Sequence, residues 1–146
     1  MYYIGIDVGR DGGIAVLSEN GLQVDSWIFS EVRLREVCKQ YKGNCKCIVE
    51  KVWAMPHQGV KSTFNFGRNF GYILGVLEAN SIPYLLVAPL RWKHEYGVTS
   101  DKSTSIAMCQ KLFPDHNLMR SKRAKKPHDG RAEAILIAEY GRRHSF

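Results

Sequence analysis

The sequence predicts an α/β fold with a central mixed sheet of five strands and helices on both faces. Short stretches of β-branched and aromatic residues open the chain, separated by glycine-rich turns, which is typical of an antiparallel meander. Later apolar stretches alternate with segments of helical periodicity. A meander followed by alternating helices and strands is expected to form one sheet covered on both faces. The length of 146 residues suits a single domain, 1–146.

The first three strands are predicted at residues 2–8, 13–18 and 21–29. The segments GRDGG and ENG join them, and glycines allow the tight turns that an antiparallel pair needs. These three strands therefore form the meander, and the remaining two strands are expected to extend it as parallel neighbours.

Helices and strands alternate after the meander. A helix is predicted from Ser30, which can cap its first turn, to Gly43, which can end it. A strand at 47–52, a long helix at about 62–80 and a strand at 83–88 follow. The segment PLRWKHEYGV is expected to be a connection. Two more helices are predicted, at about 101–113 and at about 128–143.

The net charge of +7 is concentrated in the second part of the chain. Residues 91–146 hold twelve Lys and Arg against six Asp and Glu, whereas residues 1–90 hold nine against eight. The densest run of positive charge, at residues 120–126, is flexible by composition. It is compatible with a solvated surface loop and with an arm that binds phosphates. The cations of this run are Arg120, Lys122, Arg123, Lys125 and Lys126.

Composition also bears on the compartment. No apolar run approaches the roughly 18 residues of a membrane span, and the N-terminus lacks the features of a signal peptide. We therefore expect a soluble cytoplasmic protein with no membrane partner. The cysteines lack the spacing of a zinc site and are expected to be reduced. They are Cys38, Cys45, Cys47 and Cys109.

Four carboxylates stand where an ordinary core would not place them. Asp7 and Glu50 each interrupt a strand that otherwise reads as buried, with the acid placed in the middle of the strand. Asp129 and Glu133 are four residues apart and share one face of the last helix. Such acids repel one another unless hard cations lie between them, and Mg²⁺ prefers oxygen ligands. Two ions about 4 Å apart can hydrolyse a phosphodiester, and Mn²⁺ can substitute for Mg²⁺.

Six segments in this order carry a family resemblance. They are GIDVG, IVEKV, FNFGRNFGYILGVLE, VAPLRWKHEYG, DKSTSIAMCQKLFP and HDGRAEAILIA, and together they span nearly the whole chain. The sequence resembles the RuvC family of Holliday-junction resolvases, within the ribonuclease H-like superfamily, and is more similar to the short phage versions than to the bacterial enzymes. A phage-encoded protein would work in the host cytoplasm.

The resemblance implies a Mg²⁺-dependent endonuclease that acts as a homodimer on four-way junctions and other branched DNA. It would cut two opposed strands symmetrically. Asp7, Glu50, Asp129 and Glu133 match the family's metal ligands and catalytic acids. In bacterial members the last two acids are usually three residues apart, with an aspartate second. Here Asp129 and Glu133 are four residues apart, and Gly130 occupies the position three before Glu133. His128 is therefore a further catalytic candidate beside Asp129.

The resemblance also suggests DNA contacts. The family dimerises through its aromatic helix, where an aromatic residue can wedge into the junction. The phenylalanines of this helix also fit a plain core or dimer stripe, and glycines at 67, 71 and 75 would let another helix approach closely. The expected DNA contacts outside the basic run are Arg10, Phe64, Phe66, Arg68 and Lys93.

Other interpretations remain open. Either strand acid taken alone is compatible with a structural ion pair. GIDVGRDGGIAVL is also similar to the first phosphate-binding hairpin of the actin and sugar-kinase superfamily, which would make the chain an ATP-binding protein. A module that binds branched DNA without cutting it is a third alternative.

Overall fold

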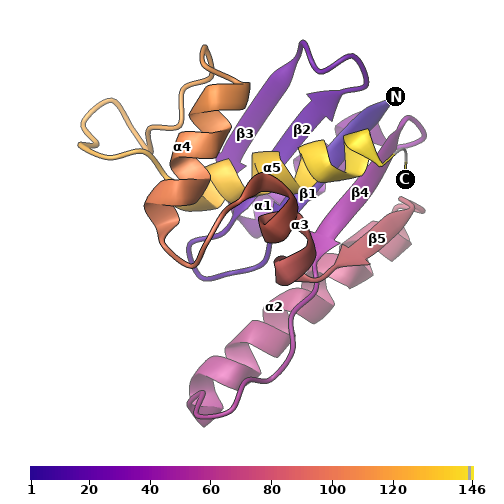
Figure 1. The fold of residues 1–146 in the computed structure, drawn as a ribbon. Helices are drawn as coiled ribbons and strands as arrows, with labels where there is room; N and C mark the ends of the chain where they lie inside the picture. The colour runs from indigo at the N-terminus through magenta and orange to yellow at the C-terminus, as the bar shows by residue number, and fades with distance from the viewer. Residues whose placement is uncertain (145) are drawn as a thin grey trace.

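A computed structural model describes residues 1–144 and 146, and it contains one mixed five-stranded sheet with helices on both faces (Figure 1). The strands are β1 (Tyr2–Asp7), β2 (Gly13–Ser18), β3 (Val24–Ile28), β4 (Cys45–Glu50) and β5 (Tyr84–Val87). The helices are α1 (Glu31–Tyr41), α2 (Val60–Ala79), α3 (Pro89–Tyr96), α4 (Lys102–Leu112) and α5 (Asp129–Arg143). None of the described helices is long and apolar enough to cross a membrane.

The sheet has the order β3-β2-β1-β4-β5. The first three strands pair antiparallel, and β4 and β5 add to β1 as parallel neighbours. The predicted meander with two parallel strands is therefore confirmed, and so is the α/β class. The central position of β1 explains why its interior residues are buried on both sides.

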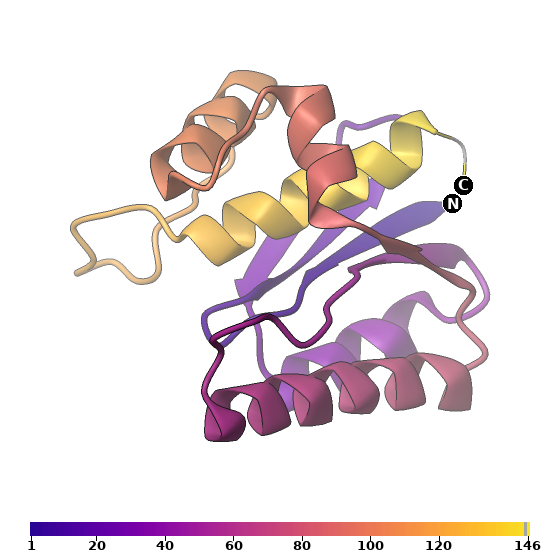
Figure 2. The same ribbon diagram turned by 60° about the horizontal axis from the view of Figure 1, so that its bottom comes forward.

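The helices form two layers. Figure 2 shows α3, α4 and α5 on one side of the sheet and α1 and α2 on the other. On the first side α5 packs along the strands, and nearly every residue of its middle turns is buried. On the second side, α1 and α2 cover the opposite faces of the same strands. The site described below lies on the α5 side.

Two glycines allow α5 to lie unusually close to the sheet. A methyl group added to Gly5 of β1 would come within 2.1 Å of the Ala134 carbonyl oxygen, and one added to Gly13 within 2.2 Å of the Gly130 carbonyl oxygen. Both neighbours are backbone atoms, which cannot move aside as a flexible side chain can. The absence of side chains at these two positions therefore sets how near α5 stands to β1 and β2.

Some predicted boundaries differ from the structure. The segment after β5 is not a plain connection: Pro89 begins α3, and Gly97 ends it in the left-handed conformation. The third strand is shorter than predicted, because residues 21–23 belong to the turn that joins it to β2. Asp7 and Glu50 are the last residues of their strands, not middle ones.

The basic run forms the tip of a loop with a fixed base. Met119 and Pro127 make an antiparallel bridge, and the Arg131 guanidinium of α5 donates to the carbonyl oxygen of Met119 at 2.6 Å. We call residues 119–127 the basic hairpin; Figure 1 shows it projecting from the body of the protein. Its cations are exposed, as predicted, but its two ends are held against α5.

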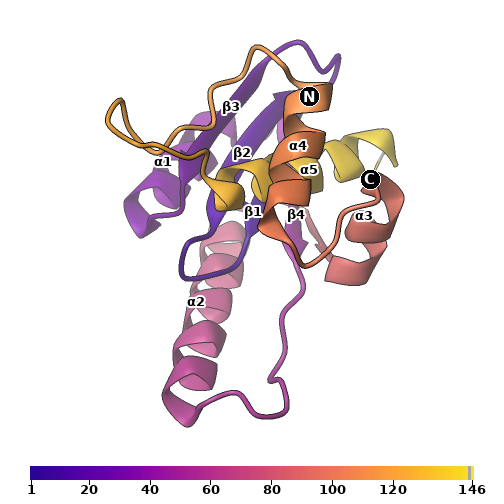
Figure 3. The ribbon, with the colours of Figure 1, turned by 60° about the vertical axis from the view of Figure 1, so that its left-hand side comes forward.

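The first half of α2 extends past the edge of the sheet (Figures 1 and 3). Only Ile73 and Leu77 of this 20-residue helix are fully buried, and both lie in its second half. The loop of residues 51–59 runs out to the free end of the helix. This projection leaves a large surface near the carboxyl ends of β1 and β4.

Candidate active site

The two strand acids lie side by side at one edge of the sheet. β1 and β4 are parallel neighbours in which Ile6 is paired with Val49, so Asp7 and Glu50 follow at equivalent positions. Side chains alternate along a strand, and Ile48, two residues before Glu50, packs on the α5 side. Both carboxylates therefore project toward α5, and not toward opposite sides of the sheet.

The last helix adds two further acids at this edge. Asp129 is the first residue of α5 and Glu133 lies one turn later, with only 2% of Glu133 exposed. The Ser105 hydroxyl of α4 donates to the Glu133 carboxylate at 3.0 Å. The fold thus brings four carboxylates, from three elements that are distant in the chain, to one edge of the sheet on the side that α5 covers.

Lys102, the first residue of α4, reaches into this group of acids. Its ammonium lies 3.3 Å from Glu133 Oε1 and 3.6 Å from Asp129 Oδ2. Sequence reasoning missed this residue. The only signal in the sequence was its position directly after Asp101, a helix cap that fixes where the lysine side chain starts.

Burial, together with repulsion between neighbouring carboxylates, disfavours the charged form of the strand acids. Burial raises the pKa of Asp7 well above its usual range, and the carboxylates of Glu133 and Glu50 raise it further. Burial also raises the pKa of Glu50. For Lys102, burial opposes the charge, yet the carboxylates of Glu133 and Asp7 leave the lysine pKa raised overall. The site therefore attracts positive charge, and one lysine does not neutralise it.

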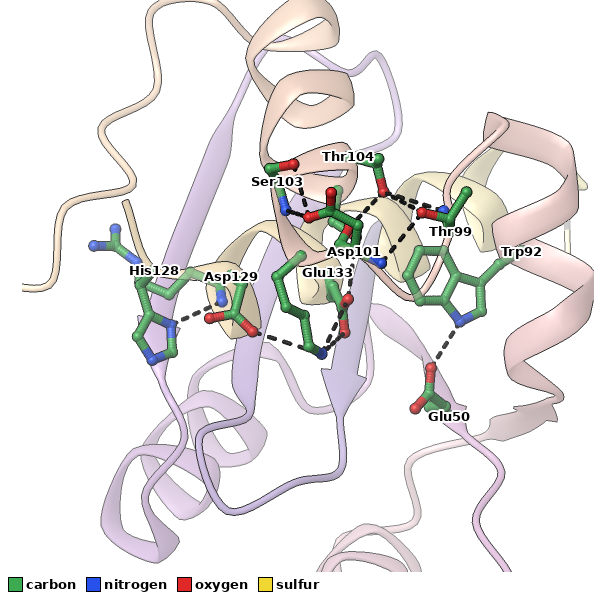
Figure 4. A network of polar contacts seen from close by, with 12 residues as sticks. Glu50, Trp92, Thr99, Asp101, Ser103, Thr104, His128, Asp129 and Glu133 are labelled. Carbon is green, nitrogen blue, oxygen red and sulfur yellow. Dashed lines mark hydrogen bonds and ion pairs between the residues drawn. The ribbon is translucent and has the colours of Figure 1, made fainter. Parts of the chain in front are cut away.

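Trp92 holds the Glu50 carboxylate in place. Its ring is fully buried in the core beneath α3, and its indole N–H donates to Glu50 Oε2 at 2.8 Å (Figure 4). This bond favours the charged form of Glu50 and so opposes the effect of burial on the pKa. From the sequence, only a packed ring is expected at position 92, because nothing local points to the acid on another strand.

Glu50 is a candidate metal ligand, and replacing Trp92 with phenylalanine is expected to lower the affinity of the site for divalent ions about 10- to 100-fold, the cost of losing a partner that orients a metal ligand. Tyr96→Phe is the matched control on the same helix. The Tyr96 hydroxyl is buried with no hydrogen-bond partner in the described part of the chain, so its removal should leave the Mg²⁺ requirement unchanged. Mn²⁺ titration of each variant by calorimetry measures the same effect without DNA, and equal affinities would contradict the role given to Trp92.

The structure places His128 and Asp129 differently. His128 is buried and caps α5, because its Nδ1 accepts a hydrogen bond from the Arg131 backbone N–H at 3.1 Å. Asp129 instead points to the Lys102 ammonium, within the group of acids. The His128 Nε2 atom is buried and has no partner among the described residues. Of the two, Asp129 is the one that lies with the other carboxylates.

The predicted DNA-contacting residues lie in three parts of the structure. Arg10 lies exposed in the turn after β1, and the basic hairpin projects beside the start of α5. On α2, Phe64 is 71% exposed and Arg68 is exposed, whereas Phe66 packs partly against the core. Lys93 is half-buried and lies over the Trp92 ring.

Another exposed aromatic residue was missed. Trp53 lies three residues beyond Glu50, in the loop that leads to α2, and half of its surface is exposed. An exposed indole offers a flat surface on which a base can stack. A signal was present in the sequence: a tryptophan within a loop is seldom fully buried.

The donor set fits magnesium. All four acids offer hard oxygen ligands, and the Lys102 ammonium between two of them shows that a cation is stabilised there. In the part of the chain that the structure describes, no three His, Cys, Asp or Glu side chains converge on one point. Mg²⁺ does not require this, because it is usually held by one or two carboxylates together with waters and substrate phosphates.

Comparison with solved structures identifies the fold. RuvC of Thermus thermophilus superposes with a TM-score of 0.66 and 18% identity, over 99% of this chain and 97% of that chain. T. thermophilus RuvC in complex with a Holliday junction substrate gives a TM-score of 0.65 and 18% identity, over 99% and 96%. No family model and no curated protein matches the sequence. The ribonuclease H-like fold expected from the RuvC resemblance is thereby confirmed.

Proposed function

We propose that the chain is a Mg²⁺-dependent, structure-specific endonuclease that resolves Holliday junctions and other branched DNA by paired symmetric nicks. The observation that carries this proposal is the gathering of Asp7, Glu50, Asp129 and Glu133 at one edge of a RuvC-like fold. A basic hairpin beside these acids supplies the charge that a DNA backbone requires. The likeness to a RuvC solved with a Holliday junction substrate supports the choice of substrate.

The four acids would hold two Mg²⁺ ions, each bound by one or two carboxylates. When bound, Mg²⁺ would activate the attacking water and stabilise the leaving oxygen of the phosphodiester. Trp92 orients the Glu50 carboxylate, and Ser105 orients that of Glu133. Lys102 partly neutralises the acids in the free protein, so the site keeps its shape before any ion enters.

A cleavage assay on a synthetic four-way junction tests this function. With Mg²⁺, the native chain should nick opposed strands of the junction and leave a linear duplex of the same sequence uncut. Glu50→Gln should bind the junction without cutting it. Equal cutting of the linear duplex would contradict structure specificity, and native-rate cutting by Glu50→Gln would contradict the metal assignment.

The two alternative functions, a DNA-binding module without cleavage and an ATP-binding protein, predict different results. A non-catalytic module would bind the junction and cut nothing at any Mg²⁺ concentration. An ATP-binding protein would bind ATP and show no preference for branched DNA. We favour the nuclease because four acids and a cationic hairpin flank the same edge of the sheet.

The basic hairpin is expected to contribute sequence-independent affinity. Replacing Lys122 and Lys125 with glutamine should weaken junction binding and reduce the slope of log K against log salt by about 0.9 for each phosphate that the protein no longer neutralises. Lys39→Gln with Lys42→Gln on and after α1 removes the same charge at another exposed surface and is the control. Fluorescence anisotropy at several salt concentrations measures both pairs. Equal slopes would remove the hairpin from DNA binding.

We further propose that the working form is a homodimer that packs through α2. Gly67, Gly71 and Gly75 recur on its exposed side, and a methyl group added to any of them would meet nothing within 4 Å. Phe64 continues this side toward the free end of the helix. A second helix could therefore approach closely, and a two-fold dimer would supply the two active sites that paired nicking requires.

The variant Gly71→Leu tests the dimer. The open space around Gly71 predicts a folded chain, while the added side chain should hold two α2 helices apart and weaken the dimer at least about tenfold. Gln40→Leu, on the exposed side of α1, adds the same apolar group elsewhere. Sedimentation equilibrium distinguishes monomer from dimer. A Gly71→Leu protein that dimerises like the Gln40→Leu control would rule out this interface.

A further inference from the structure

Lys102 places a positive charge among the candidate metal ligands. Its Nζ atom lies 3.3 and 3.4 Å from the two carboxylate oxygens of Glu133 and 3.6 Å from Asp129 Oδ2. Burial and the neighbouring carboxylates raise the pKa of Asp7, and the Lys102 ammonium opposes them. No other Lys or Arg among the described residues forms an ion pair with any of the four acids. Lys102 is therefore the counterion that the protein itself supplies to the site.

The start of the Lys102 side chain is fixed, whereas its end is free to move. Asp101 caps α4 by accepting a hydrogen bond from the Ser103 backbone N–H at 3.0 Å, and the Thr104 hydroxyl donates to the Asp101 carbonyl oxygen at 2.6 Å (Figure 4). These bonds hold the first turn of the helix in place. The Lys102 side chain is 57% exposed and has a flexible stem. Its ammonium can therefore leave the acids while the helix stays where it is.

The Glu133 carboxylate has little room for a further partner while Lys102 is bound to it. Its Oε1 atom accepts from the Lys102 ammonium and, at 3.0 Å, from the Ser105 hydroxyl, while Oε2 accepts a second bond from Lys102. A carboxylate oxygen has about two lone pairs, so a cation that binds Oε1 must replace one of these donors. Ser105 is fully buried and Lys102 is exposed, so Lys102 is the donor that can leave.

We propose that Lys102 is a counterion that divalent ions must displace. Its ammonium neutralises part of the charge of the acids in the free protein and turns out toward solvent when an ion binds the same carboxylates. The inference rests on the proposed nuclease function, which assigns the metal ligands, and adds to it a residue that sets how tightly they hold metal. Removing the charge of Lys102 should therefore have two opposite effects: the metal-free protein becomes less stable, and its affinity for metal rises.

Calorimetric titration with Mn²⁺ measures the effect on affinity. Lys102→Met keeps much of the length of the side chain and removes its charge. This variant should bind Mn²⁺ about tenfold more tightly than the native chain, since a unit charge about 5 Å from a divalent ion opposes it by roughly that factor even in bulk water. Lys102→Arg keeps a charge that cannot be lost, so its affinity should stay at or below the native value. Lys111→Met removes an exposed charge at the other end of α4 and should leave the affinity unchanged.

Thermal unfolding measures the opposite effect on stability. In EDTA, Lys102→Met should unfold at a lower temperature than the native chain and Lys111→Met, because the buried Glu133 carboxylate loses its counterion. Saturating Mn²⁺ should remove this difference, because the ion then supplies the positive charge and stabilises the folded state. Both measurements use the protein without DNA, so neither depends on cleavage.

The outcomes separate the role of Lys102 from the function. A native chain that binds no Mn²⁺ would overturn the metal site of the proposed function and this inference with it. If the native chain binds Mn²⁺ and Lys102→Met binds it equally or more weakly, the role of Lys102 alone is overturned, because a lysine that only orients the acids would give that result. An unfolding temperature of Lys102→Met in EDTA at or above the native value would also overturn the role of Lys102 alone.

Discussion

Replacing Asp7 with asparagine is expected to abolish DNA cleavage while making the protein harder to unfold in the absence of divalent ions. The loss of activity should exceed about 100-fold. Removing a residue that only orients a metal ligand already costs up to about 100-fold, and Asp7 is proposed to be a ligand itself. Asparagine keeps the shape of the side chain but loses the charge through which Asp7 would hold Mg²⁺ in the proposed function. Single-turnover cleavage of a four-way junction measures this loss, and junction binding should persist.

The gain in stability follows from the same charge. Asp7 is buried beside Glu133 and Glu50, and burial together with their carboxylates raises its pKa in the folded protein. A carboxyl with a raised folded-state pKa destabilises the fold at a pH above that pKa, and this penalty vanishes as the pH falls toward the usual value of aspartate. Asp7→Asn should therefore unfold at a higher temperature than the native chain at pH 7.5 in EDTA, and the difference should shrink as the pH is lowered.

Mg²⁺ provides the complementary comparison. In the proposed function the ion binds the folded state through the Asp7 carboxylate, so it should raise the unfolding temperature of the native chain more than that of Asp7→Asn. Asp115→Asn neutralises an exposed acid on the loop after α4 and should change neither cleavage nor stability. A native chain that is more stable than Asp7→Asn in EDTA at pH 7.5 would show that the acids do not repel one another as the structure indicates.

The substitution Gly5→Ala is expected to have the second large effect. Its added methyl group would lie 2.1 Å from the Ala134 carbonyl oxygen and 2.5 Å from the Ala138 backbone nitrogen. Because both atoms belong to the backbone of α5, the helix as a whole must move away from the sheet. Overpacking of a core costs about 1 to 3 kcal/mol, and a backbone clash should reach the upper end of that range or exceed it.

Thermal unfolding and cleavage measure the two consequences of this movement. A loss of about 3 kcal/mol corresponds to a fall of roughly 6–12 °C in Tm for a chain of this size. Cleavage should fall in parallel, since Glu133 moves with α5. Gly59→Ala is the matched control, because a methyl group there meets nothing within 4 Å. A Gly5→Ala protein as stable and active as Gly59→Ala would show that α5 does not need this close approach.

Much of the fold could be predicted from the sequence because its signals are local. Alternating apolar residues and glycine-rich turns define the meander, and Ser30 caps α1 through its side chain as expected. The helix α3 was missed although its signals were present: Pro89 begins it and Gly97 ends it. Its eight residues show too little periodicity to stand out from a connecting segment.

The site could be predicted only in part. Acids within apolar strands are conspicuous in a sequence, and the structure brings Asp7 and Glu50 to the same edge. The partners of these acids are not conspicuous. Trp92 and Lys102 meet Glu50 and Glu133 only through tertiary packing, over 42 and 31 residues of chain. No local pattern in the sequence specifies such contacts.

The anchoring of the basic hairpin has a consequence for where a strand would be cut. Arg131 holds the hairpin from the same helix that carries Glu133, two residues further along. The base of the hairpin and the Glu133 carboxylate are thus held by one helix. A DNA backbone bound by the hairpin would lie at a constant distance from Glu133. The helix α5 would therefore set the number of nucleotides between the bound phosphate and the bond that is cut.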